Sequence, residues 1–164
     1  MYTDSHCHLN FPELLSRLDE IRAEMHAAQV SRALLISTQL ETFEDVHRIA
    51  MAHDNFWCTA GVHPDEDTVQ EPTLEDLLRL GQRDKVIGIG ETGLDYYRLG
   101  DRSVADMAWQ RQRFRLHIRA ARQLHLPLVI HTRSASADTL GILKEEGEIG
   151  DADSAGGVLS LIHI

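Results

Sequence analysis

Near its start the chain carries two histidines separated by one residue, in Asp4-Ser5-His6-Cys7-His8. On a β-strand, side chains two positions apart point to the same side, so both imidazoles would face one direction and Cys7 the other. Two imidazoles on one face can bind a divalent metal ion. Because ordinary polar strand faces also carry this pattern, the metal hypothesis requires further ligands elsewhere in the chain.

Three more polar residues of ligand type follow short apolar runs. Glu91 follows 86–90, His131 follows 128–130, and His63 comes just after 56–61. Each has an ordinary alternative role: His63 could cap a turn, Glu91 could cap the next segment, and His131 could be a buried core histidine. Such independent roles would not place all of these residues at strand ends of the same polarity. We therefore interpret them as one group.

The elements that must position this group alternate along the chain. The patterns predict helices over 12–29, 42–53, 73–82, 104–124 and 137–146, and strands over 33–36, 56–61, 86–90, 126–131 and from 156 onward. The strands are apolar on both faces, which is typical of parallel sheets covered by helices. In a TIM (β/α)8 barrel, side chains at the carboxyl ends of the strands meet at one mouth. The patterns therefore predict a parallel α/β fold, and in a barrel of this type the whole group could converge on one mouth.

Composition places the chain among globular proteins. It has 164 residues, of which 43% are hydrophobic and 26% charged. No apolar run reaches the roughly 18 residues of a membrane helix, and no export signal precedes the first strand. We therefore expect a cytoplasmic protein with no membrane contact and no obligate protein partner. In a reducing compartment Cys7 and Cys58 are expected to be free thiols.

The net charge of −10 argues against a broad basic surface that coats nucleic acid. It does not exclude a nuclease, because a pocket that holds divalent cations has its own local positive charge. Such a pocket can accept a phosphate on an otherwise acidic protein.

Four ordered motifs resemble those of the TatD family of metal-dependent hydrolases. They are Asp4-Ser5-His6-Cys7-His8-Leu9, Gly61-Val62-His63-Pro64, Gly90-Glu91-Thr92-Gly93-Leu94-Asp95-Tyr96-Tyr97 and Pro127-Leu128-Val129-Ile130-His131-Thr132-Arg133. The resemblance extends over residues 1 to about 159. It implies a deoxyribonuclease that cleaves phosphodiester bonds of DNA, with single strands or strand ends as expected substrates.

The resemblance also implies roles for individual residues. His6 and His8 would bind one divalent cation, Glu91 would bridge two cations, and His131 would bind the second. His63 and Arg133 would line the substrate pocket. Asp95 would not bind a cation itself but would hold the metal ligands in position. Imidazole and carboxylate ligands leave the metal open among Mg, Mn and Zn.

The chain departs from the family pattern near its end. A complete barrel takes about 250 residues, whereas five strand-helix units and the beginning of a sixth are present here. We expect residues 1–159 to form a partial barrel and 160–164 to be a non-native tail. The family has a metal-binding histidine at the position of Ser160. A further Asp ligand on a later strand of the family is missing here. His163 lies three residues after Ser160 and would therefore be on the opposite face of the strand.

Two rival functions remain at this point. One is a small-molecule amidohydrolase, which also begins with His-x-His but commonly bridges its metals with a modified lysine; Glu91 favours the nuclease. The other is an inactive fragment, because an unclosed parallel sheet exposes an edge that invites association. On that view the chain would be poorly folded or inactive.

Overall fold

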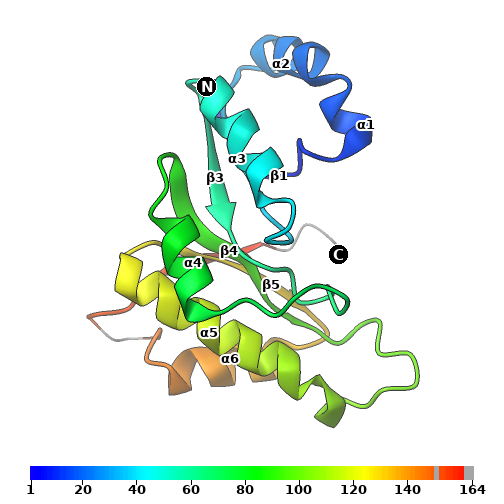
Figure 1. Ribbon diagram of the computed structural model, residues 1–164, viewed down its shortest axis with the longest axis vertical. Coiled ribbons are helices and arrows are strands. Elements are labelled where there is room, and N and C mark those ends of the chain that lie inside the picture. Colours follow the sequence, from blue (N-terminus) through cyan, green and yellow to red (C-terminus); the bar gives the residue numbers. More distant parts are fainter. Residues whose placement is uncertain (150–151, 161–164) are drawn as a thin grey trace.

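The computed structural model describes residues 1–149 and 152–160, which form one six-stranded sheet with helices around it (Figure 1). All neighbouring strands pair in parallel, in chain order from first to last. The strands are β1 (Tyr2–Cys7), β2 (Val30–Leu35), β3 (Phe56–Ala60), β4 (Val86–Asp95), β5 (Leu128–Arg133) and β6 (Gly157–Ser160). The helices are α1 (Pro12–Leu15), α2 (Leu18–Ala27), α3 (Phe43–Ala52), α4 (Leu74–Gly81), α5 (Ala108–Leu124) and α6 (Ser136–Glu145), with a 3-10 turn, η1, at Ala105–Met107.

The predicted α/β architecture is confirmed, and two predicted helices are divided. The helix expected over 12–29 breaks between α1 and α2, where the Ser16 hydroxyl donates to the Glu13 carbonyl at 3.2 Å. A serine that bonds nearby backbone in this way favours a turn over a continuing helix. The helix expected over 104–124 begins instead with η1 before α5.

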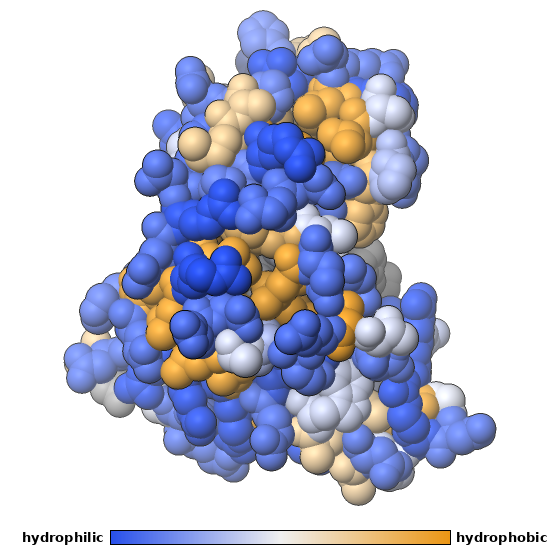
Figure 2. Space-filling view, in the orientation of Figure 1, coloured by the Kyte–Doolittle hydropathy of each residue, from blue (hydrophilic) through white to orange (hydrophobic). Residues whose placement is uncertain are grey.

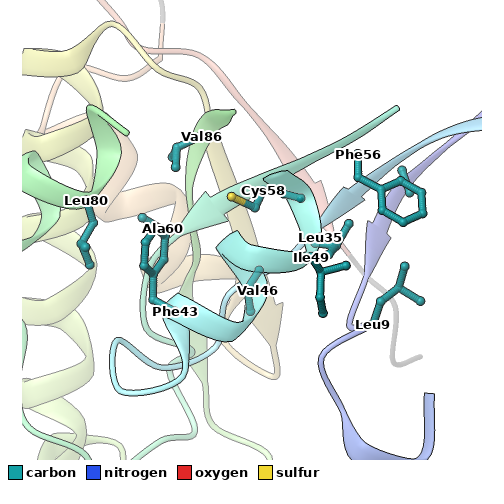
Figure 3. Close-up of a cluster of buried hydrophobic side chains, with 12 residues drawn as sticks. Leu9, Leu35, Phe43, Val46, Ile49, Phe56, Cys58, Ala60, Leu80 and Val86 are labelled. Carbon is teal, nitrogen blue, oxygen red and sulfur yellow. The ribbon is translucent and has the colours of Figure 1, made fainter. Parts of the chain in front are cut away.

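Buried apolar side chains form two clusters on the outer side of the strands. Figure 3 shows the first, in which Phe43 and Val46 of α3 lie near Phe56, Cys58 and Ala60 of β3. The second joins β4 and β5 to α5 and α6, with Ile89, Leu94, Phe114 and Ile118 fully buried. On the face drawn in Figure 2, hydrophobic residues near the middle of the molecule lie between hydrophilic side chains. Packing against helices thus buries the outer side of the central strands β2 to β5, whereas β1 and β6 are largely exposed.

The fourth strand is longer than predicted. It continues from Gly90 to Asp95, so Glu91 lies inside the strand and not at its end. Two glycines allow this path. A Cβ atom on Gly61 would lie 2.5 Å from the backbone of Gly90, and one on Gly93, whose φ is +126°, would lie 2.0 Å from the His131 carbonyl oxygen. Only glycine permits such close strand approach, so these positions bring the strands together at the site.

The carboxyl ends of the strands meet at one edge. Gly93 pairs with His131, and His131 pairs with Ser160. The first and last strands also approach each other there, because the Ser160 hydroxyl oxygen lies 2.5 Å from His6 Nδ1. The sheet therefore curls into an open barrel with its polar residues at one mouth, as the sequence predicts.

Among the described helices, none has the length and apolar character needed to span a bilayer.

Candidate metal centre

Glu91 lies at the centre of the polar group and is 4% exposed. Its Oε2 atom is 3.2 Å from His6 Nε2 and 3.9 Å from His8 Nε2. Its Oε1 atom is 3.4 Å from His131 Nδ1 and 3.9 Å from His63 Nε2. The two oxygens of one carboxylate therefore face two different pairs of imidazoles.

The geometry defines two groups of potential metal ligands that share Glu91. One consists of His6, His8 and Glu91, and the other of His63, Glu91 and His131; within each, the donor atoms lie within 4.8 Å of one another. Imidazole nitrogen with carboxylate oxygen is a donor set suited to divalent cations such as Zn²⁺ and Mn²⁺. The residues present therefore fit the metals that the sequence predicts.

Electrostatics keep the central carboxylate ionised. Burial by itself would raise the pKa of Glu91, but hydrogen bonds from His131 and His6 and the nearby imidazoles outweigh it and lower this pKa far below its usual value. The same balance acts on His131: burial lowers its pKa, while hydrogen bonds to Asp95 and Glu91 raise it to about 9. The pocket is thus built to stabilise positive charge around one buried anion.

Hydrogen bonds on the far side of each ring indicate which nitrogen can bind a metal. His8 Nδ1 lies 3.1 Å from the carbonyl oxygen of Ile36, so this nitrogen carries the proton and Nε2 presents its lone pair to the site. His131 Nε2 lies 3.0 Å from Asp95 Oδ2, which leaves Nδ1 to face Glu91. Metal-binding histidines are typically oriented by such partners. Their partners thus prepare His8 and His131 as ligands.

His63 is oriented in the opposite sense. Its Nδ1 atom accepts a hydrogen bond from the Asp65 backbone N–H at 3.1 Å, so in the neutral ring Nε2 carries the proton. Burial lowers the pKa of His63 to about 4, which keeps the ring neutral near pH 7. Its Nε2–H therefore points into the site, where Nε2 lies 3.2 Å from His131 Nδ1 and 3.9 Å from Glu91 Oε1.

Asp95 connects the centre to Arg133. Its carboxylate is buried and accepts from Arg133 Nη2 at 2.8 Å as well as from His131. Burial would raise the pKa of Asp95, but the hydrogen bonds from His131 and Arg133 lower it well below its usual range. Arg133 Nε is buried with no hydrogen-bond partner among the described residues. One side of this guanidinium is therefore anchored while another can still donate.

These side chains line a hollow of about 440 Å³ at the mouth. It contains His8, His63, Glu91, His131 and Arg133, and its other walls are Phe11, Thr38, Asp65, Glu66 and Arg98. The structure thus brings together His6, His8, His63, Glu91, Asp95, His131 and Arg133, all of the residues that the sequence singles out. Ser160 faces His6, so position 160 also points into the site; His163 lies outside the described residues.

Two residues of α5, which sequence analysis does not single out, hold the segment that carries His63. Arg113 Nη1 donates to the backbone oxygens of His63 and Glu66 at 2.9 and 2.8 Å, and its other nitrogens pair with Glu71. His117 Nε2 accepts the backbone N–H of Val62 at 3.1 Å. A polar residue at a buried position of an amphipathic helix is the signal that could have identified them.

The buried His117 predicts a pH dependence of folding. Its Nδ1 donates to the Arg113 carbonyl, and burial lowers its pKa to about 4. In the unfolded chain the pKa of this histidine is near 6.5, so between pH 4 and pH 6.5 the unfolded chain binds more protons than the folded one. The contribution of His117 to stability is therefore fully present above about pH 6.5 and is lost as the pH falls toward 4. Urea unfolding should show about 2 kcal/mol less stability from His117 at pH 5 than at pH 7. His117→Gln keeps an acceptor without titrating and should flatten this dependence; an unchanged slope would refute the assignment.

The fold is of the parallel α/β barrel type, with two groups of potential metal ligands at one mouth. The sequence pattern of the TatD related DNase family matches residues 3–158, and the chain belongs to that family. The chain is 37% identical over 160 residues to an uncharacterized metal-dependent hydrolase, YcfH, of Escherichia coli, a match that covers 95% of this chain and 57% of the relative. A 3'-5' ssDNA/RNA exonuclease, TatD, of Cronobacter sakazakii is 36% identical over 126 residues, covering 76% of this chain and 46% of that one.

A solved structure has the same fold. The crystal structure of YJJV, a TatD homologue of Escherichia coli, superposes with a TM-score of 0.80 at 25% identity and covers 88% of this chain and 56% of that one. The chain therefore spans little more than half the length of the relatives that it matches.

Proposed function

We propose that this protein is a deoxyribonuclease that cleaves phosphodiester bonds with two divalent cations. Its cation ligands would be His6, His8, Glu91 and His131. The observation that supports this most strongly is the single carboxylate of Glu91, whose two oxygens face separate imidazole pairs. Family membership supports metal-dependent hydrolysis, and the exonuclease named TatD supports nucleic acid as the substrate class.

Two divalent cations at this centre would supply Lewis-acid activation of a phosphodiester and of the attacking water. The chain's own residues would hold and balance that charge. Glu91 stays ionised and could serve as a ligand of both cations. His8 would offer Nε2, and His131 would offer Nδ1 once a cation displaces the proton that its raised pKa keeps there. Asp95 fixes the His131 ring through a 3.0 Å hydrogen bond.

His63 and Arg133 would act on the substrate. The Nε2–H of His63 points toward the centre and can donate to a phosphate oxygen or to the leaving oxygen. Arg133 lines the hollow and is held by Asp95 through Nη2, so its guanidinium charge is positioned beside the place where a phosphate would bind. These donors explain how a protein with a net charge of −10 could accept a phosphate.

The two opposite ring orientations provide the test. We expect His131→Ala to lose bound metal and activity together, because this ring presents its lone pair to the centre. His63→Ala should keep its metal content and lose about 10²-fold in the rate of single-stranded DNA hydrolysis. Metal content by atomic emission and hydrolysis of a labelled oligonucleotide would be measured on the same samples.

Two results would contradict the proposal. Loss of metal in His63→Ala would make His63 a ligand and not a donor. Hydrolysis of a cyclic amide without any hydrolysis of DNA by the parent protein would favour the amidohydrolase.

A further inference from the structure

An aromatic side chain stands at the rim of the metal centre with most of its surface exposed. Tyr97 lies two residues after the end of β4 at Asp95 and is 66% exposed. The guanidinium carbon of Arg133 lies 4.6 Å from the centre of its ring. This contact fixes the ring beside the hollow that contains Glu91, and the exposed fraction shows that much of the ring remains available.

Two guanidinium groups accompany this ring. Arg133 is anchored by Asp95 at 2.8 Å and retains a buried Nε without a partner among the described residues. Arg98 lines the same hollow, and its ion pair with Asp65 is long, at 3.8 Å. The rim therefore combines a flat aromatic surface with two cationic groups that have donors to offer.

We propose that Tyr97, Arg98 and Arg133 form a nucleotide subsite of the metal centre, in which the Tyr97 ring stacks on a nucleobase and the guanidiniums bind a phosphate. This rests on the proposed function and deepens it, because it assigns the features that would select a polynucleotide over a small phosphodiester. Stacking suits an unpaired base, since bases within a duplex already stack on each other. The ligand is therefore a single-stranded polynucleotide whose base sequence matters little.

A simpler role for Tyr97 would be to shield the ion pair of Arg133 and Asp95 from water. The two roles predict that Tyr97 affects the binding of different ligands. A shield would affect every ligand that Arg133 binds, whether or not it carries bases. A stacking surface would affect only ligands that carry bases.

The experiment compares a fluorescein-labelled oligothymidylate with an abasic oligonucleotide of equal length, both with cleavage-resistant phosphorothioate linkages, and follows binding by anisotropy in the presence of Mn²⁺. The parent should bind the oligothymidylate about 5- to 150-fold more tightly than the abasic strand, and Tyr97→Ala should lose this preference. Tyr97→Phe keeps the ring face and should retain it. Tyr2, which is also 66% exposed but begins β1 at the opposite end of the strands, provides the matched control Tyr2→Ala.

The outcomes separate this proposal from the proposed function. If Tyr97→Ala weakens both strands equally, or neither, the stacking subsite is wrong. Hydrolysis of bis(p-nitrophenyl) phosphate by the parent with Mn²⁺ tests the phosphodiesterase chemistry without any base. If the parent hydrolyses this compound and Tyr97→Ala keeps the base preference, the proposed function stands and the subsite falls. If the parent neither hydrolyses it nor binds either strand, both fall.

Discussion

Replacement of Glu91 by alanine should lower the rate of DNA hydrolysis by more than about 10³-fold. Removal of one electrostatic donor from an active site costs about 10² to 10³ in rate, and Glu91 would serve both cations at once. Its oxygens face all four imidazoles of the centre at 3.2 to 3.9 Å. The measurement is single-turnover hydrolysis of a labelled single-stranded oligonucleotide with saturating Mn²⁺.

The matched control for this variant is Glu75→Ala. Glu75 lies in the first turn of α4 and is exposed, so its removal should leave the rate unchanged. Circular dichroism would establish that both variants keep the fold. A folded Glu91→Ala protein with a rate within tenfold of the parent would refute the bridging role.

Divalent cations should stabilise the folded protein by about 5 kcal/mol when the free cation concentration is about a hundred times the Kd of each site. Each occupied site contributes about 2.7 kcal/mol at that concentration, and the ligands of both sites are in place only in the folded chain. For a chain of this size the expected rise in Tm is on the order of 10–20 °C. Calorimetric scans with Mn²⁺ and with EDTA would measure it.

Glu91→Gln provides the control for cation binding because it removes the shared charge and nearly keeps the shape of the side chain. It should lose most of the cation-dependent rise in Tm. An equal rise in both proteins would place the cations elsewhere, for example on the exposed acidic residues. This readout does not depend on catalytic activity, so it separates the binding of metal from its use.

The sequence predicts most of the fold because its periodicity is strong. The buried runs of β3 and β5 and the amphipathic patterns of α3 and α4 have the expected type within a few residues. The capping box at Thr73, where Asp76 returns the hydrogen bond, shows why the start of α4 is easy to place. The break before α2 was not predicted, because the apolar spacing continues across it.

The candidate site is predicted in its residue types and less well in its geometry. The strand positions of His6, Glu91 and His131 predict that they converge, and the structure brings them together. The direction of each imidazole depends on a backbone group from elsewhere in the chain, such as the Ile36 oxygen for His8 and the Asp65 N–H for His63. Such tertiary contacts leave no periodic trace in the sequence.

The contribution of α5 was missed for a related reason. Arg113 occurs in an arginine-rich helix, where charged residues usually face solvent, yet its side chain is 1% exposed and holds the His63 segment. The signal that could have singled it out is its position beside Phe114 on the buried face of the helix.

The central claim is that one carboxylate joins two cation sites. Crystals grown with Mn²⁺ and measured at the manganese absorption edge would test it most directly. We predict two anomalous peaks, one among His6, His8 and Glu91 and one between Glu91 and His131, each within coordination distance of a different Glu91 oxygen. A single peak, or peaks that do not contact Glu91, would contradict the account.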